Sequence, residues 1–488
     1  MTPLTIIVLY LCLLLGVAVL SNVFLKKTAG DFFLASRSIG PFMLFMSLFG
    51  TTMTAFSLTG SSGFTFKNGI VTYGLMGSWS ALVHPLIFFL VGAKVWALGK
   101  RHGYLTQLSY LRDRYQSSFL TLLLFPLLVG FIMLYVLMGA IGAGSALQGI
   151  AGLEYKWGVA LVSSVVLVYV FFGGMRGTAW ANTMQTLVFL IMGAVAFVVI
   201  VSDLGGPQEA TRQVVEHANA EVAKRAVRTD FNKGVFASYC LIPISVGMFP
   251  HLFQHWLTAK KASNFKLSVA AFPFCILILW APCVLIGMWA TASLPLEVPG
   301  NEVLPRMVSA HAGNVLSGLI GAGILAAMMS SMDSQFLCLG SMFTNDFYLH
   351  FIAKDRPSER SVVWMGRMFV ISIVVATYFI ALYCHKKSVF GLGVWCFTGF
   401  TSLFPILVGG LYWKRSNKYG AIASVVVVAC MWLYYIDRAL EPGGFLLLGV
   451  LPVVLMLAAS TLAFVVASLV TPPPDEAHIA KFFAPGPG

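Results

Sequence analysis

Long apolar runs recur from one end of this chain to the other, and they restrict the folds that it can adopt. Hydrophobic residues make up 58% of its 488 residues, and charged residues make up only 10%. A run of about 20 apolar residues can cross a bilayer as a helix, and a helix satisfies its own backbone hydrogen bonds in lipid. The sequence therefore predicts an all-α polytopic membrane protein in contact with the lipid bilayer.

We expect about thirteen transmembrane segments from the lengths of these runs. They cover residues 3–25, 40–64, 70–98, 118–149, 157–173, 178–202, 234–256, 266–292, 313–345, 362–384, 388–412, 419–436 and 444–470. An odd number of crossings places the two ends of the chain on opposite sides of the membrane.

The basic residues indicate which end is cytoplasmic. The net charge of +13 is compatible with nucleic-acid binding, but no nucleic-acid motif is present, and the charges lie in short connections between apolar segments. Cytoplasmic loops of membrane proteins are enriched in Lys and Arg. We therefore expect the N-terminus outside and the C-terminus in the cytoplasm. The basic residues in question are Lys26, Lys27, Arg37, Lys100, Arg101, Arg112, Arg114, Lys260, Lys261, Lys266, Lys354, Arg356, Arg360, Lys414, Arg415 and Lys418.

One transmembrane segment carries a carboxylate. Asp333 lies within residues 323–348, beside a helix face of small and hydroxyl residues. An unpaired charge near the bilayer centre costs roughly 2.5–3.5 kcal/mol or more, so an ion or proton site is the default hypothesis. The face consists of Gly323, Ala327, Ser330, Ser331, Ser334, Cys338 and Ser341.

Two other segments read as interrupted helices. Residues 50–63 place glycine and hydroxyl residues inside the apolar segment 40–64, and Pro243, Ser245, Gly247 and Pro250 interrupt 234–256. Paired broken helices in two halves of a chain mark the binding site of many transporters. Their spacing of five segments matches a five-plus-five inverted repeat. Close helix packing and a simple proline kink are the structural alternatives.

Several short motifs, in this order, resemble the sodium:solute symporter family, whose members carry proline, pantothenate, monocarboxylates, sugars or iodide. Each motif is weak alone, and the order and spacing carry the resemblance. The motifs are 31–38 (DFFLASRS), 103–106 (GYLT), 112–115 (RDRY), 173–185 (GGMRGTAWANTMQ), Pro250 with His251, Ser330 with Ser331, 345–348 (NDFY) and 409–415 (GGLYWKR).

The resemblance implies a leucine-transporter-type fold with two five-helix inverted repeats. It divides the chain into an extra helix and the loop after it (1–39), a first repeat (40–202), an extracytoplasmic loop (203–233), a second repeat (234–415) and two C-terminal helices (416–470). The Pro-rich composition of residues 471–488 predicts a disordered cytoplasmic tail. The resemblance also implies a sodium site formed by the backbone carbonyls of Gly50, Met53 and Ala327 and the hydroxyls of Ser330 and Ser331. Hydrogen bonding within the helix remains the alternative role of the two serines.

The chain departs from the family pattern at two positions. Asn182 stands where many members have Asp, and Asp333 stands where many have a small hydroxyl residue. In members with a second sodium site these positions lie close together. We therefore expect a second cation or proton site at Asp333, Ser334 and Asn182, with a purely structural hydrogen bond as the alternative.

The substrate pocket is expected between the two broken segments. The candidate residues carry hydroxyl or aromatic groups, which suit a small organic acid or an amino acid better than a sugar. They are Thr52, Thr54, Ser57, Tyr135, Ser245, Trp395 and Thr398. His251 and His255 belong either to an inner gate or to a helix end at the level of the lipid headgroups.

These observations predict a sodium-coupled symporter of a small organic solute in a plasma membrane. The lack of an N-x-S/T acceptor fits a bacterial inner membrane. A proton-coupled carrier of the same fold and a solute sensor are the alternatives. An enzyme is disfavoured because the chain has no HExxH or GxSxG motif and no catalytic pair of carboxylates in its transmembrane segments.

Overall fold

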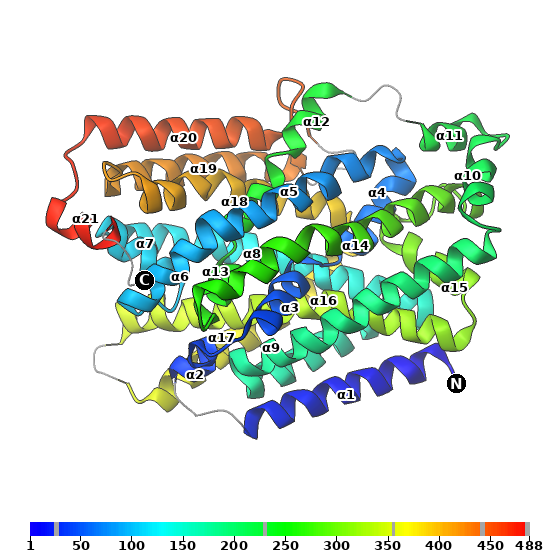
Figure 1. The fold of residues 1–488 in the computed structure, drawn as a ribbon, viewed down its shortest axis with the longest axis horizontal. Helices are drawn as coiled ribbons and strands as arrows, with labels where there is room; N and C mark the ends of the chain where they lie inside the picture. The colour runs from blue at the N-terminus through cyan, green and yellow to red at the C-terminus, as the bar shows by residue number, and fades with distance from the viewer. Residues whose placement is uncertain (24–28, 228–231, 354–356, 440–444, 484–488) are drawn as a thin grey trace.

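A computed structural model describes residues 1–23, 29–227, 232–353, 357–439 and 445–483, and within these residues every regular element is helical. The long helices run in a common direction, with α10 and α11 at one end of the bundle and α7 and α21 at the other (Figure 1). We call these the loop end and the tail end. The chain starts at the loop end, and α21, the last described helix, lies at the tail end (Figure 1).

The helices follow one another along the chain with short connections. They are α1 Pro3–Val23, α2 Ala29–Leu34, α3 Pro41–Thr52, α4 Ser61–Asn68, α5 Ser78–Ile87, α6 Ala93–His102, α7 Gln107–Tyr115, α8 Ser118–Ala151, α9 Tyr155–Asp203, α10 Pro207–Val215, α11 Ala220–Ala223, α12 Lys233–Tyr239, α13 Pro250–Thr258, α14 Phe265–Ser293, α15 Val303–His311, α16 Asn314–Met342, α17 Glu359–Tyr383, α18 Val389–Tyr412, α19 Lys418–Ala439, α20 Pro452–Val470 and α21 Glu476–Phe483. π-Helical turns at Phe56–Gly60, Tyr73–Gly77, Phe88–Gly92 and Phe343–Ile352 and a 3₁₀ segment at Ile242–Gly247 extend several of them.

The lengths of the helices agree with the expected transmembrane segments. In the described residues, 9 helices are long and apolar enough to cross a membrane, and two bent pairs raise the number to 11. The 49-residue α9 would measure about 74 Å if straight, more than twice the ~30 Å thickness of a bilayer core. Because it is broken in its middle, it supplies two crossings, and the apolar α1 supplies one more. The prediction of an all-α polytopic fold with about thirteen crossings is confirmed.

The break in α9 occurs at Gly174. Its φ of 52° and ψ of −156° are not helical, and a side chain there would meet the ring and carbonyl oxygen of Phe32 at 2.7 and 2.8 Å. Glycine adopts a positive φ without the steric cost of a Cβ atom. The glycine pair of the 173–185 motif therefore turns the chain and lets α2 approach closely.

Helix α16 lies at the centre of the bundle. It packs against α9, α8, α1, α3 and α17, and every residue from Ile320 to Met342 is buried. Asp333 is consequently surrounded by protein and does not face lipid. This position explains why a helix that carries a carboxylate and many hydroxyl groups is tolerated in an apolar bundle.

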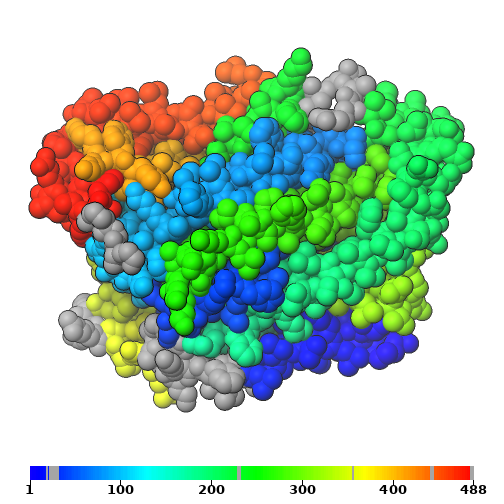
Figure 2. All heavy atoms as spheres, in the orientation of Figure 1, coloured from blue at the N-terminus to red at the C-terminus, as the bar shows by residue number. Residues whose placement is uncertain are grey.

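The expectation of a disordered tail over 471–488 is wrong for the part that forms α21. Phe482 is buried, and its ring lies 6.2 Å from that of Tyr110 on α7, so apolar burial orders the segment. In the space-filling view α21 (red) lies against the blue spheres of α6 and α7 (Figure 2). Residues 484–488, the basic residues Lys26, Lys27, Lys354 and Arg356, and the side chain of Asp31 lie outside the described parts of the chain.

Candidate functional site

The two interrupted segments predicted from the sequence are broken helices. The pair α3 and Phe56–Asn68 bends by 51°, and the pair Lys233–Gly247 and α13 bends by 50°. In the first break Met53 is extended (φ −88°, ψ 106°), and the hydroxyl of Thr54 accepts a bond from the N–H of Phe56 at 3.1 Å. In the second break Phe249 is extended and Pro250 starts the next helix.

The two breaks lie on either side of one aromatic ring. Phe397 on α18 lies 5.0 Å from the ring of Phe56 at the first break and 5.5 Å from that of Phe249 at the second. The two breaks, one from each half of the chain, therefore lie close to the same side chain of α18, and paired broken helices are the arrangement expected of a transporter's binding site.

The residues of the predicted sodium site lie on α3 and α16 at the first break. The Ser330 hydroxyl donates to the carbonyl oxygens of Gly50 at 2.8 Å and Ala327 at 3.0 Å. The Ser331 hydroxyl donates to the Met328 carbonyl at 2.9 Å. Met53 follows the last residue of α3 and caps the end of that helix. The oxygen atoms expected to bind the cation are all neutral, which fits a hard monovalent cation that must bind reversibly.

A close contact between helices positions this oxygen set. A Cβ atom on Gly50 would lie 2.3 Å from the Thr186 hydroxyl on α9 and 3.6 Å from the Cβ of Ser330. The Thr186 hydroxyl donates to the carbonyl of Met46, one turn earlier on α3, at 2.9 Å. Because Gly50 has no side chain, α3 can lie against α9 and α16 at once.

A second polar cluster surrounds the fully buried carboxylate of Asp333. It accepts from the hydroxyls of Tyr169 and Ser334, each at 3.0 Å. The Asn182 amide is oriented with its NH₂ toward Asp333 Oδ2 at 2.9 Å and its oxygen toward the hydroxyls of Thr51 and Ser334. In the reverse orientation the amide oxygen would face only hydrogen-bond acceptors and the NH₂ group only donors. The predicted neighbours Asp333, Ser334 and Asn182 are thus brought together, and the described residues place no Lys or Arg in hydrogen-bond or ion-pair contact with this carboxylate.

The sequence analysis did not name Tyr169 and did not assign His255 to this cluster. Tyr169 lies on α9 in a run of apolar residues. Its hydroxyl group was the only feature of this run that could have indicated a polar contact. His255 Nε2 lies 3.0 Å from the Ser334 hydroxyl. His255 and His251 are both buried and contact α16 and α8 respectively, so protein surrounds both side chains, and their assignment to an inner gate or to a helix end stays a prediction.

The candidate substrate residues are all buried but differ in their bonding. The hydroxyls of Thr52 and Thr398 bond carbonyls of their own helices, and Trp395 stacks on Trp432 with 5.8 Å between centroids. Tyr135 lies 5.2 Å from the rings of Phe249 and Phe397. Among the described residues, no partner bonds the hydroxyls of Ser57, Ser245 or Tyr135. The assignment of these residues to a substrate pocket stays a prediction.

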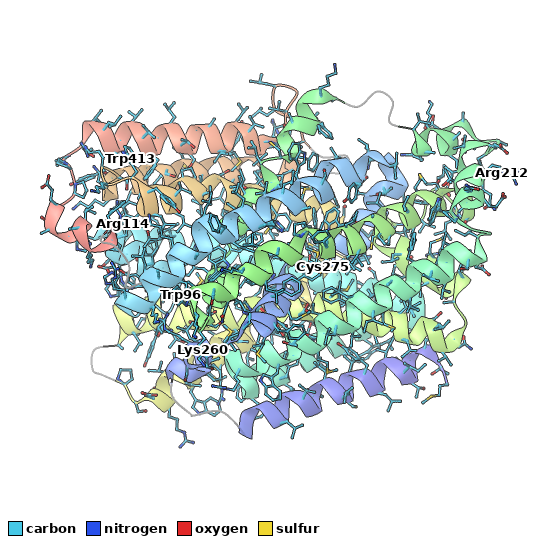
Figure 3. The ribbon with its side chains drawn as sticks, in the orientation of Figure 1. Trp96, Arg114, Arg212, Lys260, Cys275 and Trp413 are labelled. Carbon is cyan, nitrogen blue, oxygen red and sulfur yellow. The ribbon has the colours of Figure 1, made fainter. Side chains whose placement is uncertain are left out.

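Both ends of the bundle close over the breaks. At the tail end the N–H of Ile39 donates to the Thr258 carbonyl at 3.1 Å, and the N–H of Lys260 donates to the Ile39 carbonyl at 3.0 Å. Trp96 and Lys260 lie near each other in Figure 3, and the Trp96 indole donates to the Ala259 carbonyl at 2.7 Å. Toward the loop end, Phe390 stacks on Phe56 and Phe64 at 4.6 and 4.1 Å.

Comparison with known proteins decides what kind of protein carries this site. The sequence model of the sodium:solute symporter family matches residues 32–427. The chain belongs to this family. It is therefore a membrane transporter with sodium as its coupling ion, and it is not an enzyme.

Relatives of this symporter are known from bacteria. An osmoregulated proline transporter of Bacillus subtilis is 25% identical over 476 residues, which cover 94% of this chain and 93% of that protein. A sodium/pantothenate symporter of Escherichia coli is 26% identical over 475 residues, with 95% of each chain covered. A solved structure of a Na⁺-coupled sialic acid symporter superposes with a TM-score of 0.80 at 17% identity, covering 97% of this chain and 99% of that one. That likeness confirms the leucine-transporter-type fold.

Proposed function

We propose that this symporter imports a small organic solute, an organic acid or an amino acid, by alternating access. The observation that carries the proposal is the bond from Ser330 to the Gly50 carbonyl at 2.8 Å, because it joins the broken α3 to α16 beside the first helix break. The names of the relatives support the substrate class, since proline and pantothenate are both carboxylates of small size.

Sodium would bind to the carbonyl oxygens of Gly50, Met53 and Ala327 and the hydroxyls of Ser330 and Ser331. Because these groups belong to α3 and α16, the ion would hold the two helices in one relative position. A ligand shifts a conformational equilibrium only by its different affinity for the two states. Coupling therefore requires that sodium and the solute stabilise the same arrangement of the broken helices.

Asp333, Ser334 and Asn182 would form a second cation site or a proton site. A buried carboxylate without a cationic partner is costly in this setting, and a bound cation or a proton removes that cost. This cluster also favours the main alternative function, a proton-coupled carrier in which Asp333 is the transported site. The contacts of Asp333 with Tyr169 and Ser334 are the observation in favour of that alternative.

The proposed location is a bacterial inner membrane with the tail end in the cytoplasm. Six basic residues from two connections cluster at this end, near α21. They are Lys100, Arg101, Arg112, Arg114, Lys414 and Arg415. Such enrichment is typical of cytoplasmic loops. The N-terminus, at the loop end, would then face the outside.

The test is uptake of labelled monocarboxylates, amino acids, pantothenate and sugars by proteoliposomes, with sodium and proton gradients imposed separately, for wild type and Ser331→Ala. We expect sodium-driven accumulation of one carboxylate solute, lost or weakened in the variant. Accumulation driven by protons alone would transfer the coupling role to Asp333. No uptake by folded protein, together with solute binding, would favour the solute-sensor alternative.

A further inference from the structure

An open polar cavity lies at the tail end of the bundle, where α7 and α21 meet (Figure 1). Its volume is about 620 Å³, within the roughly 300–1,000 Å³ of pockets that hold small molecules. The π-helical segment Phe343–Ile352, which continues α16, and the start of α8 complete its wall. None of the described residues that line it belongs to either helix break. The polar lining includes Arg112, Gln116, Ser117, Ser118, His350 and His478.

Arg112 on α7 supplies guanidinium donors that the fold leaves uncommitted. Its side chain is 24% exposed, and its Nη1 atom lies 3.7 Å from Asp346 Oδ1, a distance too long for a hydrogen bond. That nitrogen has no hydrogen-bond partner among the described residues, whereas the nearby Arg114 donates to carbonyl oxygens at 2.8 and 3.0 Å. Asp346 therefore attracts Arg112 to the cavity wall, and N–H groups remain for a further acceptor.

The start of α8 adds donors of a second kind. Ser117 caps this 34-residue helix by accepting from the N–H of Leu120 at 3.1 Å. The first N–H groups of a helix have no partner within it, and they carry the positive end of the helix dipole. The Ser118 hydroxyl lies 2.8 Å from His350 Nε2, so both groups stand at the same edge of the cavity. Together with Arg112, these groups favour an anion as the ligand.

The carboxylates around the cavity do not oppose an anion, because each has a cationic partner. Lys481 bonds both oxygens of Asp113, at 2.7 and 2.9 Å, and Tyr104 donates to the same group. Asp346 is fully buried beside Arg112 and accepts from the Thr106 hydroxyl at 2.6 Å. The helix dipole of α8 is then the charge that is left without a partner.

Exposed apolar side chains continue the cavity along the outside of the bundle. Each of them lies within four residues of Ser118 or His350, and their exposed fractions are 41–55%. Farther along, the rings of Phe125 and Phe347 stack at 5.1 Å, which holds the two helices together. An anion site next to an exposed apolar strip matches a phospholipid, whose charged headgroup adjoins its acyl chains. The strip consists of Phe119, Leu122, Phe351 and Ile352.

We infer that this cavity binds a phosphate group, that of an anionic phospholipid whose acyl chains lie along the strip. Arg112 forms paired bonds to the phosphate oxygens, and Ser118, His350 and the first N–H groups of α8 bond the others. Basic pockets between transmembrane helices are typical binding sites for such headgroups. The lipid joins α7 and α8 to the end of α16 and so stabilises the bundle. A free phosphate ion has the same binding chemistry, and the experiment separates the two sources.

The experiment measures thermal unfolding of the purified protein in dodecyl maltoside and a phosphate-free buffer. Dioleoyl phosphatidylglycerol, dioleoyl phosphatidylcholine and inorganic phosphate are titrated separately. We expect phosphatidylglycerol to raise the unfolding midpoint more than phosphatidylcholine, whose choline group neutralises its phosphate, and inorganic phosphate to leave the midpoint unchanged. In Arg112→Gln the phosphatidylglycerol concentration for half of the shift should rise at least about tenfold, because bonds to a charged group are lost.

Two further variants separate lipid binding from general destabilisation. Arg112→Gln leaves the buried Asp346 without its cation, so the double variant Arg112→Gln, Asp346→Asn removes both charges and should show the same loss of lipid effect. His350→Ala, at an exposed position, should raise the concentration for half of the shift by about threefold. Each shift is measured from the variant's own lipid-free midpoint, so a change in basal stability does not enter the comparison.

Lys418→Gln is the matched control. It removes one positive charge from the exposed start of α19, outside the cavity lining, and its phosphatidylglycerol titration should equal that of wild type. An equal loss in Lys418→Gln and Arg112→Gln would show general attraction to a basic surface and overturn the inference. Native mass spectrometry provides a second measure, since wild type should retain phosphatidylglycerol under conditions in which both Arg112 variants lose it.

Equal stabilisation by phosphatidylglycerol and phosphatidylcholine overturns the inference, as do equal titrations of wild type and both Arg112 variants. Stabilisation by inorganic phosphate that Arg112→Gln abolishes, without an effect of phosphatidylglycerol, would assign the cavity to a free phosphate ion and overturn the lipid as its source. None of these measurements requires transport, so the lipid site and the proposed import succeed or fail separately.

Discussion

The hydroxyl of Ser330 on α16 donates to the carbonyl oxygen of Gly50 on α3 at 2.8 Å. These residues are far apart in the sequence, and each lies in a segment whose polar residues disturb an otherwise apolar run. A side-chain hydroxyl here meets a backbone carbonyl next to a helix break, so any cation bound between them contacts both halves of the chain. The same contact makes the site sensitive to the distance between α3 and its neighbours.

Gly50→Ala should weaken sodium coupling. The added Cβ would lie 2.3 Å from the Thr186 hydroxyl, which forces α3 away from α9 and moves the Gly50 carbonyl from Ser330. The half-saturating sodium concentration for uptake should rise by about tenfold or more, equivalent to ~1.4 kcal/mol. Gly391→Ala, whose Cβ would meet only ordinary contacts at 3.6 Å and beyond, serves as the control. An unchanged sodium dependence in Gly50→Ala would argue against the site.

Asp333→Asn should change the ion coupling of transport. The amide has the size of the carboxylate and can still bond Tyr169 and Ser334, but it cannot carry a proton or hold a cation as a charge. We expect a lower number of cations moved per solute, measured as the ratio of ion and solute fluxes in proteoliposomes. Asp203→Asn, at the exposed loop-end pair with His311, should leave the ratio unchanged. If Asp333→Asn keeps the wild-type ratio and sodium dependence, the role of Asp333 is structural.

Arg114→Lys should destabilise the fold. The buried guanidinium donates to the carbonyls of Gly410 at 2.8 Å and Trp413 at 3.0 Å and to the Ser416 hydroxyl at 2.8 Å, and Figure 3 shows Arg114 close to Trp413. A lysine has a single ammonium group and cannot make the same planar set of bonds. We expect a loss of about 2 kcal/mol, seen as a lower midpoint of thermal unfolding in detergent.

Arg212→Lys provides the comparison for Arg114. Its guanidinium forms an exposed pair with Glu209 at the loop end, where solvent screens the interaction. The unfolding midpoint should stay at the wild-type value. Equal destabilisation by both substitutions would contradict the importance assigned to the buried bonds of Arg114.

Asp113→Asn should release α21 from the tail end. Lys481 bonds both carboxylate oxygens of Asp113, at 2.7 and 2.9 Å, and Tyr104 donates to it as well. Burial raises the pKa of Asp113, but the bonds from Lys481 and Tyr104 outweigh this effect and hold the pKa below its usual value. Hydrogen exchange of residues 476–483 should accelerate in the variant, and Glu209→Gln at the loop end should leave it unchanged.

The lowered pKa also sets the pH dependence of this docking. A carboxyl group with a depressed pKa in the docked state stabilises that state above its ordinary pKa of about 4, and the contribution disappears as the pH falls through the lowered pKa. Exchange of residues 476–483 should therefore be independent of this group between neutral pH and pH ~5 and should rise only in stronger acid. A loss of protection near neutral pH would show that another group controls the docking.

Much of the architecture follows from local patterns. Each long apolar run became a crossing helix, and the clusters of glycine, hydroxyl residues and proline at 50–63 and 243–250 became the two breaks. The order of the family motifs placed Ser330 opposite Gly50 correctly, since these groups bond directly. The tail was misjudged because its composition suggested disorder, while the burial of Phe482 and the pair between Lys481 and Asp113 depend on surfaces that only the folded bundle provides.

The sequence by itself determined that the protein is a helical membrane protein with two broken helices, an intramembrane carboxylate and the motifs of a sodium symporter, because hydropathy and short motifs are properties of neighbouring residues. The tertiary structure decided which polar groups meet. It brought Tyr169 and Asn182 to Asp333, His255 to Ser334, and His251 to Tyr135. These partners come from helices distant in the sequence, and their contacts depend on how the helices pack and rotate, which no local pattern specifies.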